Sequence, residues 1–326
     1  MDEKIIEALK KKEAYMHPVK EIEFIQTHIS WVFLTGDYVY KLKKPVKFSF
    51  LDFSTFEKRK FFCEEEVRLN RRLSPDIYLG VVPLVEKDGK YGFSLEGEII
   101  ETAVRMKQLP QNSKMDVLLR EGKITERNVE EIAKIIADFH NKIETIKDEK
   151  YSSPEIVQEQ IDDLSGVKET VEKICGKGEK IDFILEKCDS FIASNKELMR
   201  KRQKDGKIKD CHGDLHSGNI FIDDKIHIFD CIEFSKDFRY VDIASEIAFM
   251  AMDLDYHGRE DLSKKFVDRY VELSQDKELL KLLNLYKCYR ANVRTKIHSF
   301  EYEHNPEAKE KIIKYLELCE RYAKEL

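Results

Sequence analysis

The chain has 326 residues, of which 37% are charged, and its formal net charge is −6. This length allows a large core and about two domains, and the balanced charges exclude the strongly basic surface typical of proteins that bind nucleic acid or anionic membranes. No apolar run is long enough to span a bilayer, and the seven cysteines form no Cys-x-x-Cys pair, so we expect a cytoplasmic protein with free thiols and no membrane or nucleic-acid partner.

The first third of the chain predicts β-strands and one helix. Residues 30–44 form two apolar runs joined by a Thr-Gly-Asp turn, which indicates a hairpin. Residues 51–75 predict a helix, with Ser54 and Glu57 as a capping box at its start and a proline after its end. Three strand-like runs follow over residues 78–106, separated by glycine turns.

The rest of the chain predicts mainly helices. The helical pattern begins at Met115 and is interrupted by loops and short strands over residues 209–234. We therefore expect an α+β fold with two lobes: a small β-rich lobe over 1–106, a hinge over 107–111 and a larger helical lobe over 112–326.

The interrupting stretch, KDCHGDLHSGNIFIDDKIHIFDCIEF, allows two interpretations. As a metal site, it offers His212 and His216, which on a helix would share one face, with Cys211 and Cys231 as sulfur ligands. Glycines on both sides of the second histidine disfavour a helix, however, and without a helix this spacing has no geometric meaning. The metal interpretation is therefore the weaker one.

The second interpretation is a catalytic loop for phosphoryl transfer. Asp214 precedes Asn219 by five positions, which is the spacing of the kinase motif His-x-Asp-x-x-x-x-Asn. Asp214 would orient the attacking hydroxyl and accept its proton, and Asn219 would offer an oxygen to Mg²⁺. Asp230 ends the next β-like run and would be the second metal ligand.

The chain resembles a known family through these motifs. The run HGDLHSGNIFIDDKIHIFDCIEF, with YVDIASEIAF after it, is similar to the aminoglycoside phosphotransferase and choline kinase branch of the protein-kinase-like fold. GDYVYKLKKPVKFSFLDFST, RLNRRLSPDIYLGVVPL and YRANVRTK resemble a bacterial and archaeal group within it, some members of which add a P-loop kinase domain. The resemblance covers roughly residues 17–300 and implies ATP, Mg²⁺ and a small-molecule hydroxyl acceptor. The sequence lacks both a P-loop motif and the glycine-rich loop of protein kinases, so we expect the form without the added domain.

A kinase-like site also needs a strand lysine held by a helix glutamate. Lys41 and Lys43 alternate onto one face of their predicted strand. We choose Lys41 because apolar residues flank it, with Lys43 as the alternative; the contrary interpretation is that both are solvated. Of Glu64, Glu65 and Glu66, only Glu66 falls on the apolar stripe of the helix, where a carboxylate needs a cationic partner.

The resemblance assigns two further features. The run from Thr102 to Met106, including Val104, would present backbone groups to a purine, unless it is a plain edge strand. Asp242 would accept hydrogen bonds from the backbone of the catalytic loop, although an aspartate at a helix N-terminus is also favoured by the helix dipole alone.

Two histidines have structural interpretations. His140 ends an apolar helical stripe, and we interpret it as a hydrogen-bonded core histidine rather than a functional one. We expect His212 to hold the loop rather than to transfer a proton.

Charged stripes on two later helices concern the acceptor. Asp242, Glu246 and Asp253 lie on one face of an apolar helix, and a basic stripe containing Arg290 and Arg294 lies on another. Either the two helices pair through these charges, or some of them, namely Asp242, Glu246, Arg290 and Arg294, face the acceptor. In the second case the acceptor would be an anionic or neutral polyol rather than a polycation.

Together these features predict an ATP- and Mg²⁺-dependent phosphotransferase acting on a small-molecule hydroxyl. The alternative is a nucleotide-binding regulatory protein that keeps the fold but transfers nothing.

Overall fold

The computed structural model describes residues 3–93, 96–302 and 305–326. The chain divides into two compact units. The first unit combines Met1–Lys114 with Asn219–Lys236, and the second combines Met115–Gly218 with Asp237–Leu326. The sequence predicts the division at a hinge over 107–111 and the segment 219–236 in the helical part, whereas this segment packs with the first unit.

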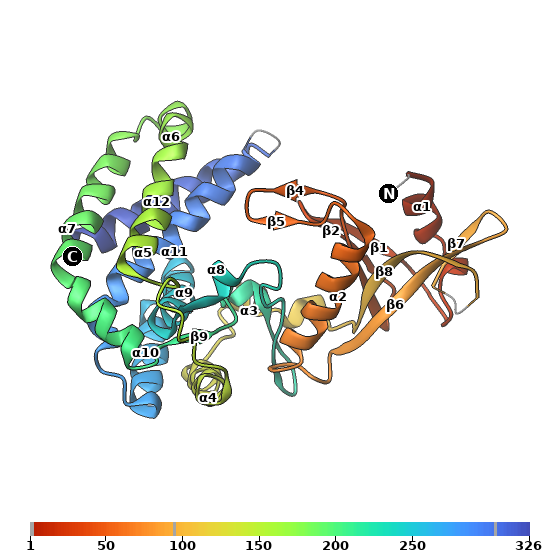
Figure 1. The fold of residues 1–326 in the computed structure, drawn as a ribbon, viewed down its shortest axis with the longest axis horizontal. Helices are drawn as coiled ribbons and strands as arrows, with labels where there is room; N and C mark the ends of the chain where they lie inside the picture. Colours follow the sequence, from red (N-terminus) through yellow and green to blue (C-terminus); the bar gives the residue numbers. More distant parts are fainter. Residues whose placement is uncertain (1–2, 94–95, 303–304) are drawn as a thin grey trace. The chain divides into compact units, whose positions relative to one another are not determined.

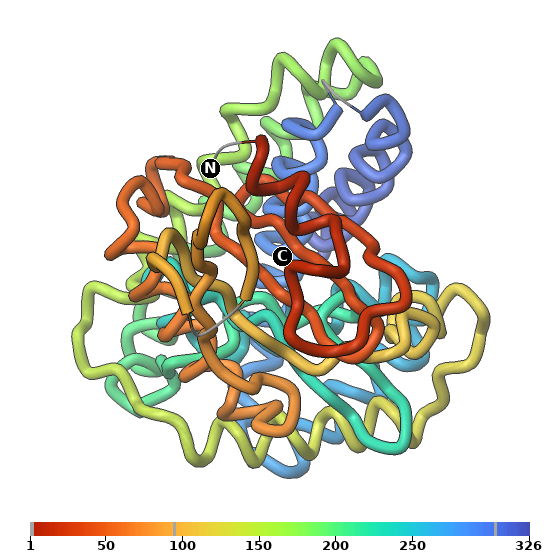
Figure 2. The backbone as a smooth tube through the Cα atoms, turned by 90° about the vertical axis from the view of Figure 1, so that its right-hand side faces the viewer, coloured from red at the N-terminus to blue at the C-terminus, as the bar shows by residue number. Residues whose placement is uncertain are grey.

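The first unit is built on a six-stranded antiparallel sheet in the order β1-β2-β3-β8-β6-β7. The strands are β1 Glu23–Gln26, β2 Ser30–Leu34, β3 Tyr38–Lys43, β6 Tyr78–Lys87, β7 Lys90–Gly92 and β8 Glu98–Lys107. Two short strands, β4 Lys47–Phe48 and β5 Leu51–Asp52, pair separately. The backbone of the sheet, in red and orange, can be followed in Figure 1 and, turned by 90°, in Figure 2. The hairpin of β2 and β3 and the three later strands match the sequence predictions.

The two faces of the sheet differ because side chains alternate along β3. Tyr40 and Leu42 join an apolar cluster with Leu9 of helix α1 (Glu3–Leu9). On the other face, Val39 packs on the cluster below helix α2 (Phe56–Asn70), which contacts β3, β6 and β8. Lys41 and Lys43 share this second face, so the fold buries two lysines beneath α2.

Helix α2 begins one residue later than the predicted capping box implies. Thr55 is the N-cap residue, and its hydroxyl accepts a hydrogen bond from the backbone N–H of Lys58 at 3.3 Å. Ser54 instead donates its hydroxyl hydrogen bond to Asp52 at 2.5 Å. Either residue can cap a helix, and the turn that Asp52 forms with Ser54 leaves this role to Thr55.

The segment 219–236 adds a small antiparallel hairpin to the first unit. Its strands are β10 Ile220–Ile222 and β11 Ile226–Ile228, with Ile220 opposite Ile228. Phe221 also forms a β-bridge with Lys114. The residues just outside this hairpin are those that the sequence analysis assigned to metal binding.

The second unit is helical. Its helices are α3 Met115–Arg120, α4 Glu126–Lys142, α5 Pro154–Asp162, α6 Lys168–Cys175, α7 Glu179–Lys204, α8 Lys236–Arg239, α9 Ile243–Tyr256, α10 Glu260–Ser274, α11 Leu279–Glu301 and α12 Ala308–Lys324, and β9 Ile208–Asp210 pairs with β12 Tyr240–Asp242. Helix α9 packs against α10, α11 and α12, and its residues from Ile243 to Asp255 are all buried. Among the described residues, none of these helices has the length and apolar character needed to cross a membrane.

Candidate active site

Two lysines of β3 meet one glutamate of α2. Lys41 Nζ lies 2.9 Å from Glu66 Oε1, and Lys43 Nζ donates to Glu66 Oε2 at 2.7 Å. Each lysine has a second carboxylate partner: Lys41 donates to Asp230 at 2.6 Å, and Lys43 donates to Glu233. The interpretation of both as solvated lysines is therefore wrong. Of the two lysines, Lys41 is the one that contacts Asp230; the choice of Lys41 as the lysine that contacts phosphate stays a prediction.

The charges of this cluster are strongly coupled. Burial alone would lower the pKa of Lys41, but Asp230 and then Glu66 raise it well above its ordinary value. Burial likewise opposes the charge of Lys43, whose pKa is raised by Glu233 and Glu66. Burial would raise the pKa of Glu66, yet the two lysines lower it to about 2. The cluster therefore carries two ammonium groups and a buried carboxylate near neutral pH.

Asp230 has a backbone conformation that non-glycine residues rarely adopt. Its φ of 63° is left-handed, which costs about 1 kcal/mol or more for an L-residue with a side chain. Tyr78 and Asn70 hold this conformation. The Asp230 N–H donates to the Tyr78 hydroxyl oxygen at 3.1 Å, and the Cys231 N–H donates to Asn70 Oδ1 at 2.8 Å. Tyr78 and Asn70 could not be found from the sequence, because nothing in their spacing links them to Asp230.

Asn219 and Asp230 lie at the same end of the β10–β11 hairpin. Asn219 precedes β10 and Asp230 follows β11, and the Phe229 N–H donates to the Asn219 carbonyl at 3.0 Å. An amide and a carboxylate supply the hard oxygen atoms that Mg²⁺ prefers, and the Asp230 side chain is 42% exposed. The donor set therefore fits a magnesium ion.

The expectation for the run Thr102–Met106 is corrected by the sheet. Strand β8 lies between β3 and β6 and is not an edge strand. Val104 pairs with Lys41 on one side and Val81 on the other, and Met106 pairs with Val39 and Tyr78. Their backbone groups are thus engaged in the sheet rather than presented to a purine. Their side chains instead join the apolar cluster that contains Val39, Leu109 and Phe229.

In the second unit, the loop before Gly218 is held from several sides. Glu246 of α9 accepts the backbone N–H of His212 at 3.1 Å and of Gly213 at 2.7 Å. Arg290 of α11 donates to the Gly213 carbonyl at 3.0 Å, and Asp253 accepts the Ser217 N–H at 2.8 Å. Gly213 has a φ of 87°, which a residue with a side chain would adopt only with strain. These contacts fix the loop around Asp214.

The role assigned to Asp242 is wrong, and Glu246 fills it. The Asp242 carboxylate accepts two hydrogen bonds from Arg202, both at 2.7 Å, and also caps α9 through the Ala244 N–H. It is 1% exposed, and its hydrogen bonds within the described part of the chain go to Arg202 and to the start of α9 rather than to the loop backbone. Glu246 lies one turn further along α9, which moves its carboxylate to the loop.

His140 is a buried histidine with two partners, as the core interpretation predicts. One ring nitrogen lies 3.0 Å from Glu246 and the other 2.7 Å from the Tyr270 hydroxyl. Burial would raise the pKa of Glu246, but the hydrogen bond and charge of His140, followed by His212 and the Gly213 N–H, lower it to about 2. Glu246 is therefore ionised beneath the loop at neutral pH.

Asp214 is surrounded by basic side chains of its own unit. His216 Nε2 lies 3.4 Å from Asp214 Oδ2, and the Asp214 N–H donates to His212 Nδ1 at 3.2 Å. Burial would raise the pKa of Asp214, but His216, then Arg294 and His212, lower it well below its usual range. The carboxylate is therefore ionised at neutral pH, and His212 contacts the loop as predicted.

The acidic and basic stripes pair only in part, through Arg294, whose charge acts on Asp253. Helices α9 and α11 do pack together, but Asp242, Glu246 and Asp253 bind Arg202, His140 and loop backbone. Arg290 is buried and donates to Gly213 and Ser245, so it supports the loop. Asp242, Glu246 and Arg290 thus lie in the interior, which leaves Arg294 as the predicted acceptor contact.

The alternative metal site is not formed by the predicted residues. His212 Nδ1 and His216 Nδ1 each accept a backbone N–H from two residues ahead. Among the described residues, potential metal ligands gather only at His140, Cys211 and Glu246, whose ligand atoms lie within 4.8 Å of one another. Because Glu246 already accepts hydrogen bonds from His140 and the loop, these contacts account for the cluster without a metal.

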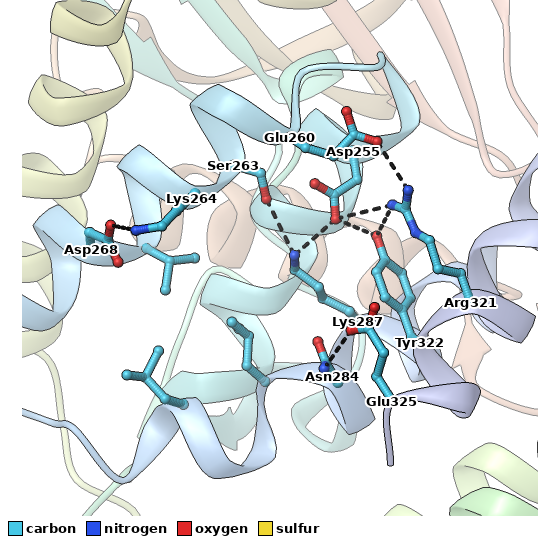
Figure 3. A pocket seen from close by; sticks show the side chains of 13 residues that line it. Asp255, Glu260, Ser263, Lys264, Asp268, Asn284, Lys287, Arg321, Tyr322 and Glu325 are labelled. Carbon is cyan, nitrogen blue, oxygen red and sulfur yellow. Dashed lines mark hydrogen bonds and ion pairs between the residues drawn. The ribbon is translucent and has the colours of Figure 1, made fainter.

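A hollow of about 380 Å³ lies elsewhere in the second unit, between α10, α11 and α12 (Figure 3). Its charged side chains satisfy one another. Asp255 accepts hydrogen bonds from Lys287 at 2.9 Å and from the Tyr322 hydroxyl at 2.5 Å, and Lys264 pairs with Asp268. We therefore assign no ligand to this hollow.

Comparisons with known proteins identify the fold. No protein-family model matches the chain. It is 31% identical over 307 residues to uncharacterised proteins of Mycobacterium tuberculosis and Mycobacterium bovis. The match covers 92% of this chain but only 60% of the length of those relatives.

Solved structures of small-molecule kinases are similar to the chain over nearly all of its length. Glucosamine kinase in complex with glucosamine, ADP and inorganic phosphate gives a TM-score of 0.51 at 15% identity, with 97% of this chain and 81% of that chain covered. An aminoglycoside phosphotransferase from Alicyclobacillus acidocaldarius gives 0.51 at 12% identity, with 95% and 91% covered. The predicted α+β protein-kinase-like fold is confirmed.

Proposed function

We propose that the chain is an ATP- and Mg²⁺-dependent phosphotransferase that acts on a hydroxyl group of a small molecule. The observation that carries this proposal is the convergence of Lys41, Glu66 and Asp230 from three distant segments, with Asp230 held in a left-handed conformation. A strained backbone at a charged residue is typical of functional sites. The solved structure of glucosamine kinase with ADP, which shares the fold, supports a nucleotide as the donor.

In this proposal the first unit binds the nucleotide. Lys41 contacts phosphate oxygens, and Glu66 holds Lys41 in position. Asn219 and Asp230 hold Mg²⁺, which when bound neutralises phosphate charge. The apolar cluster with Val104 lies on the same face of the sheet as Lys41, and the partly buried side chains packed against it, Val39, Leu109 and Phe229, offer apolar surface for the base.

Asp214 orients the acceptor hydroxyl and accepts its proton. Its low pKa keeps the carboxylate ionised, so it always presents a hydrogen-bond acceptor, but it also makes Asp214 a weak base. Positioning of the hydroxyl therefore contributes more than proton abstraction before the transition state. Glu246 and Arg290 keep the loop in place on either side of Gly213.

Arg294 is proposed to influence which acceptor binds. Its guanidinium lies over the Tyr315 ring at 5.8 Å, and its charge also acts on Asp214, so it lies near the position where the acceptor hydroxyl would bind. A guanidinium there favours an acceptor that carries a carboxylate or phosphate, or a neutral polyol, over a polycationic one.

The seven cysteines are free, which supports action in the reducing cytoplasm.

The test is direct detection of product. The protein is incubated with Mg-ATP and pools of sugars, amino alcohols, sugar acids and aminoglycosides, and products are searched by mass spectrometry for the gain of one phosphoryl group. Asp214→Asn should abolish the product. Asp224→Asn, an exposed aspartate in the turn between β10 and β11, is the matched control and should leave product formation unchanged. Nucleotide binding without any phosphorylated product across all pools would favour the regulatory alternative.

A further inference from the structure

The buried pair Lys43–Glu233 has no part in the reaction outlined above, although it contacts the same glutamate as Lys41. We propose that Lys43 and Glu233 form a fixed anchor that holds Glu66 and the segment carrying Asp230, while Lys41 exchanges Asp230 for nucleotide phosphate. Both are positioning residues rather than catalytic ones. The exchange rests on the proposed function, whereas the anchor itself does not.

The two lysine pairs differ in their access to solvent. The side chains of Lys43 and Glu233 are 1% and 4% exposed, whereas those of Lys41 and Asp230 are 14% and 42% exposed. Breaking a fully buried ion pair leaves an unpaired charge away from water, which is strongly unfavourable. The Lys43–Glu233 contact is therefore the one that persists, and the Lys41–Asp230 contact is the one that a ligand can replace.

The geometry at Glu66 separates the two lysines in the same way. Lys43 donates a hydrogen bond to Oε2, which fixes the carboxylate plane. Oε1 lies 2.9 Å from Lys41 Nζ in an ion pair. The shorter contact of Lys41 is its hydrogen bond to Asp230, at 2.6 Å. Lys41 is thus attracted to Glu66 without being locked to it.

The charge balance explains why Lys43 matters to Lys41. The cluster contains two ammonium groups and the carboxylates of Glu66, Glu233 and Asp230. Lys43 offsets one of the two negative charges that Glu66 and Glu233 carry when both are ionised. Both groups already act on Lys41, and without Lys43 their attraction for Lys41 would be stronger, because opposite charges interact more strongly away from water. Lys41 would then be withheld from phosphate.

The anchor also acts on the backbone. Lys43 lies on β3, and Glu233 lies three residues after Asp230. With Tyr78 and Asn70 holding the N–H groups of Asp230 and Cys231, Lys43 restrains the far end of the same segment. The left-handed conformation at Asp230 is thus restrained from both ends.

The first experiment measures how much the phosphates add to nucleotide affinity. Dissociation constants for adenosine and for Mg-ADP are determined by calorimetry for the wild type, Lys41→Met and Lys43→Met. The ratio of the dissociation constant for adenosine to that for Mg-ADP should fall about tenfold or more in both variants. Lys41→Met removes the charged hydrogen bond to phosphate, and Lys43→Met withholds Lys41 from it. Arg59→Met is the matched control, since it removes another buried ion pair of α2, with Glu101, that lies outside the cluster; its ratio should stay at the wild-type value.

The second experiment needs no ligand. Hydrogen exchange is followed in peptides covering residues 228–234 for Lys43→Met, Lys41→Met and Arg59→Met, and for Glu233→Gln, which removes only a charge and keeps the side-chain shape. Exchange should rise about tenfold in Lys43→Met and Glu233→Gln and stay near the wild-type rate in the other two.

The two readouts separate the possible failures. A wild type that gains no affinity from the phosphates would contradict the proposed function, while the exchange rates would still decide the anchor. Unchanged exchange over 228–234 in both Lys43→Met and Glu233→Gln would overturn the anchor. The anchor would also be overturned if Lys43→Met kept the full gain in affinity from adenosine to Mg-ADP while Lys41→Met lost it.

Discussion

Replacing Glu246 by glutamine should destabilise the second unit in a pH-dependent manner. In the folded protein the pKa of Glu246 is about 2, against an ordinary value of 4.5, and this gap corresponds to about 3 kcal/mol of stabilisation. Because the folded pKa is the lower one, the contribution is fully present above pH 4.5 and is lost as the pH falls toward 2. At pH 7 we therefore expect Glu246→Gln to lose about 3 kcal/mol, a drop in Tm of about 6–12 °C.

The structure gives the reason for this magnitude. The carboxylate accepts from His140, His212 and Gly213, and a glutamine amide has one oxygen instead of two. One N–H of the buried loop backbone would face the amide NH₂ and lose its partner, which costs about 1–3 kcal/mol, and the remaining bonds would lose their charge assistance.

The assay is urea unfolding of both proteins between pH 7 and pH 3. The difference in unfolding free energy should shrink as the pH falls below 4.5, because the unfolded wild-type chain then takes up a proton at Glu246 while the folded carboxyl, with a pKa of about 2, stays largely ionised. Glu197→Gln, at an exposed position on α7, should show no difference at any pH. A Glu246→Gln deficit that is equal at pH 7 and pH 3 would refute the assignment of the stabilisation to the ionised carboxylate.

Three further predictions concern activity. Asp214→Asn should lower kcat by about two to four decades with unchanged nucleotide affinity, since it removes the carboxylate that positions the hydroxyl and accepts its proton, whereas Asp230→Asn should weaken Mg-nucleotide binding measured by calorimetry; wild-type turnover in the first variant would contradict its assignment. Lys41→Ala and Glu66→Ala should be coupled, so the double variant should lose less nucleotide affinity than the two single losses summed, and strict additivity would count against the pair. Arg294→Ala should raise the acceptor KM several-fold with nearly unchanged Tm, and a large fall in Tm with normal kinetics would instead show a structural role.

Local features of the fold could be predicted from the sequence because they depend on neighbours in the chain. The β2–β3 hairpin follows from a Gly-centred turn between apolar runs, and α2 follows from the apolar stripe on which Glu66 lies. The start of α2 was missed by one residue, because Ser54 and Thr55 cap equally well and the decision came from Asp52.

The supporting contacts could not be predicted because they join distant segments. Both Asp242 and Glu246 are acidic residues at the start of α9, and only the position of Arg202 and of the loop decides which of them binds the loop. The pairing of Lys43 with Glu233 spans 190 residues, and no local periodicity indicates it. The interior position of β8 in the sheet likewise depends on its pairing with β6, and the alternation of side chains along β8 does not indicate this pairing.

The membership of residues 219–236 in the first unit has a consequence for how the protein is made. Lys41 and Asp230 are 189 residues apart, and the whole stretch from Met115 to Gly218 lies between them in the chain. During synthesis the sheet emerges long before the hairpin that holds Asn219 and Asp230, so the first unit stays incomplete until more than two thirds of the chain has been translated.

Until then, Lys43 lacks its carboxylate partner Glu233. The hydroxyl oxygen of Tyr78 and the amide oxygen of Asn70 likewise lack the backbone N–H groups from which they accept hydrogen bonds. A ribosome-bound fragment ending at Lys114 would therefore expose polar groups that the finished protein buries. Closing so long a loop is slow compared with forming the local hairpins. Docking of the β10–β11 hairpin should accordingly be a late step in folding, and the proposed nucleotide-binding site should form only when this step is complete.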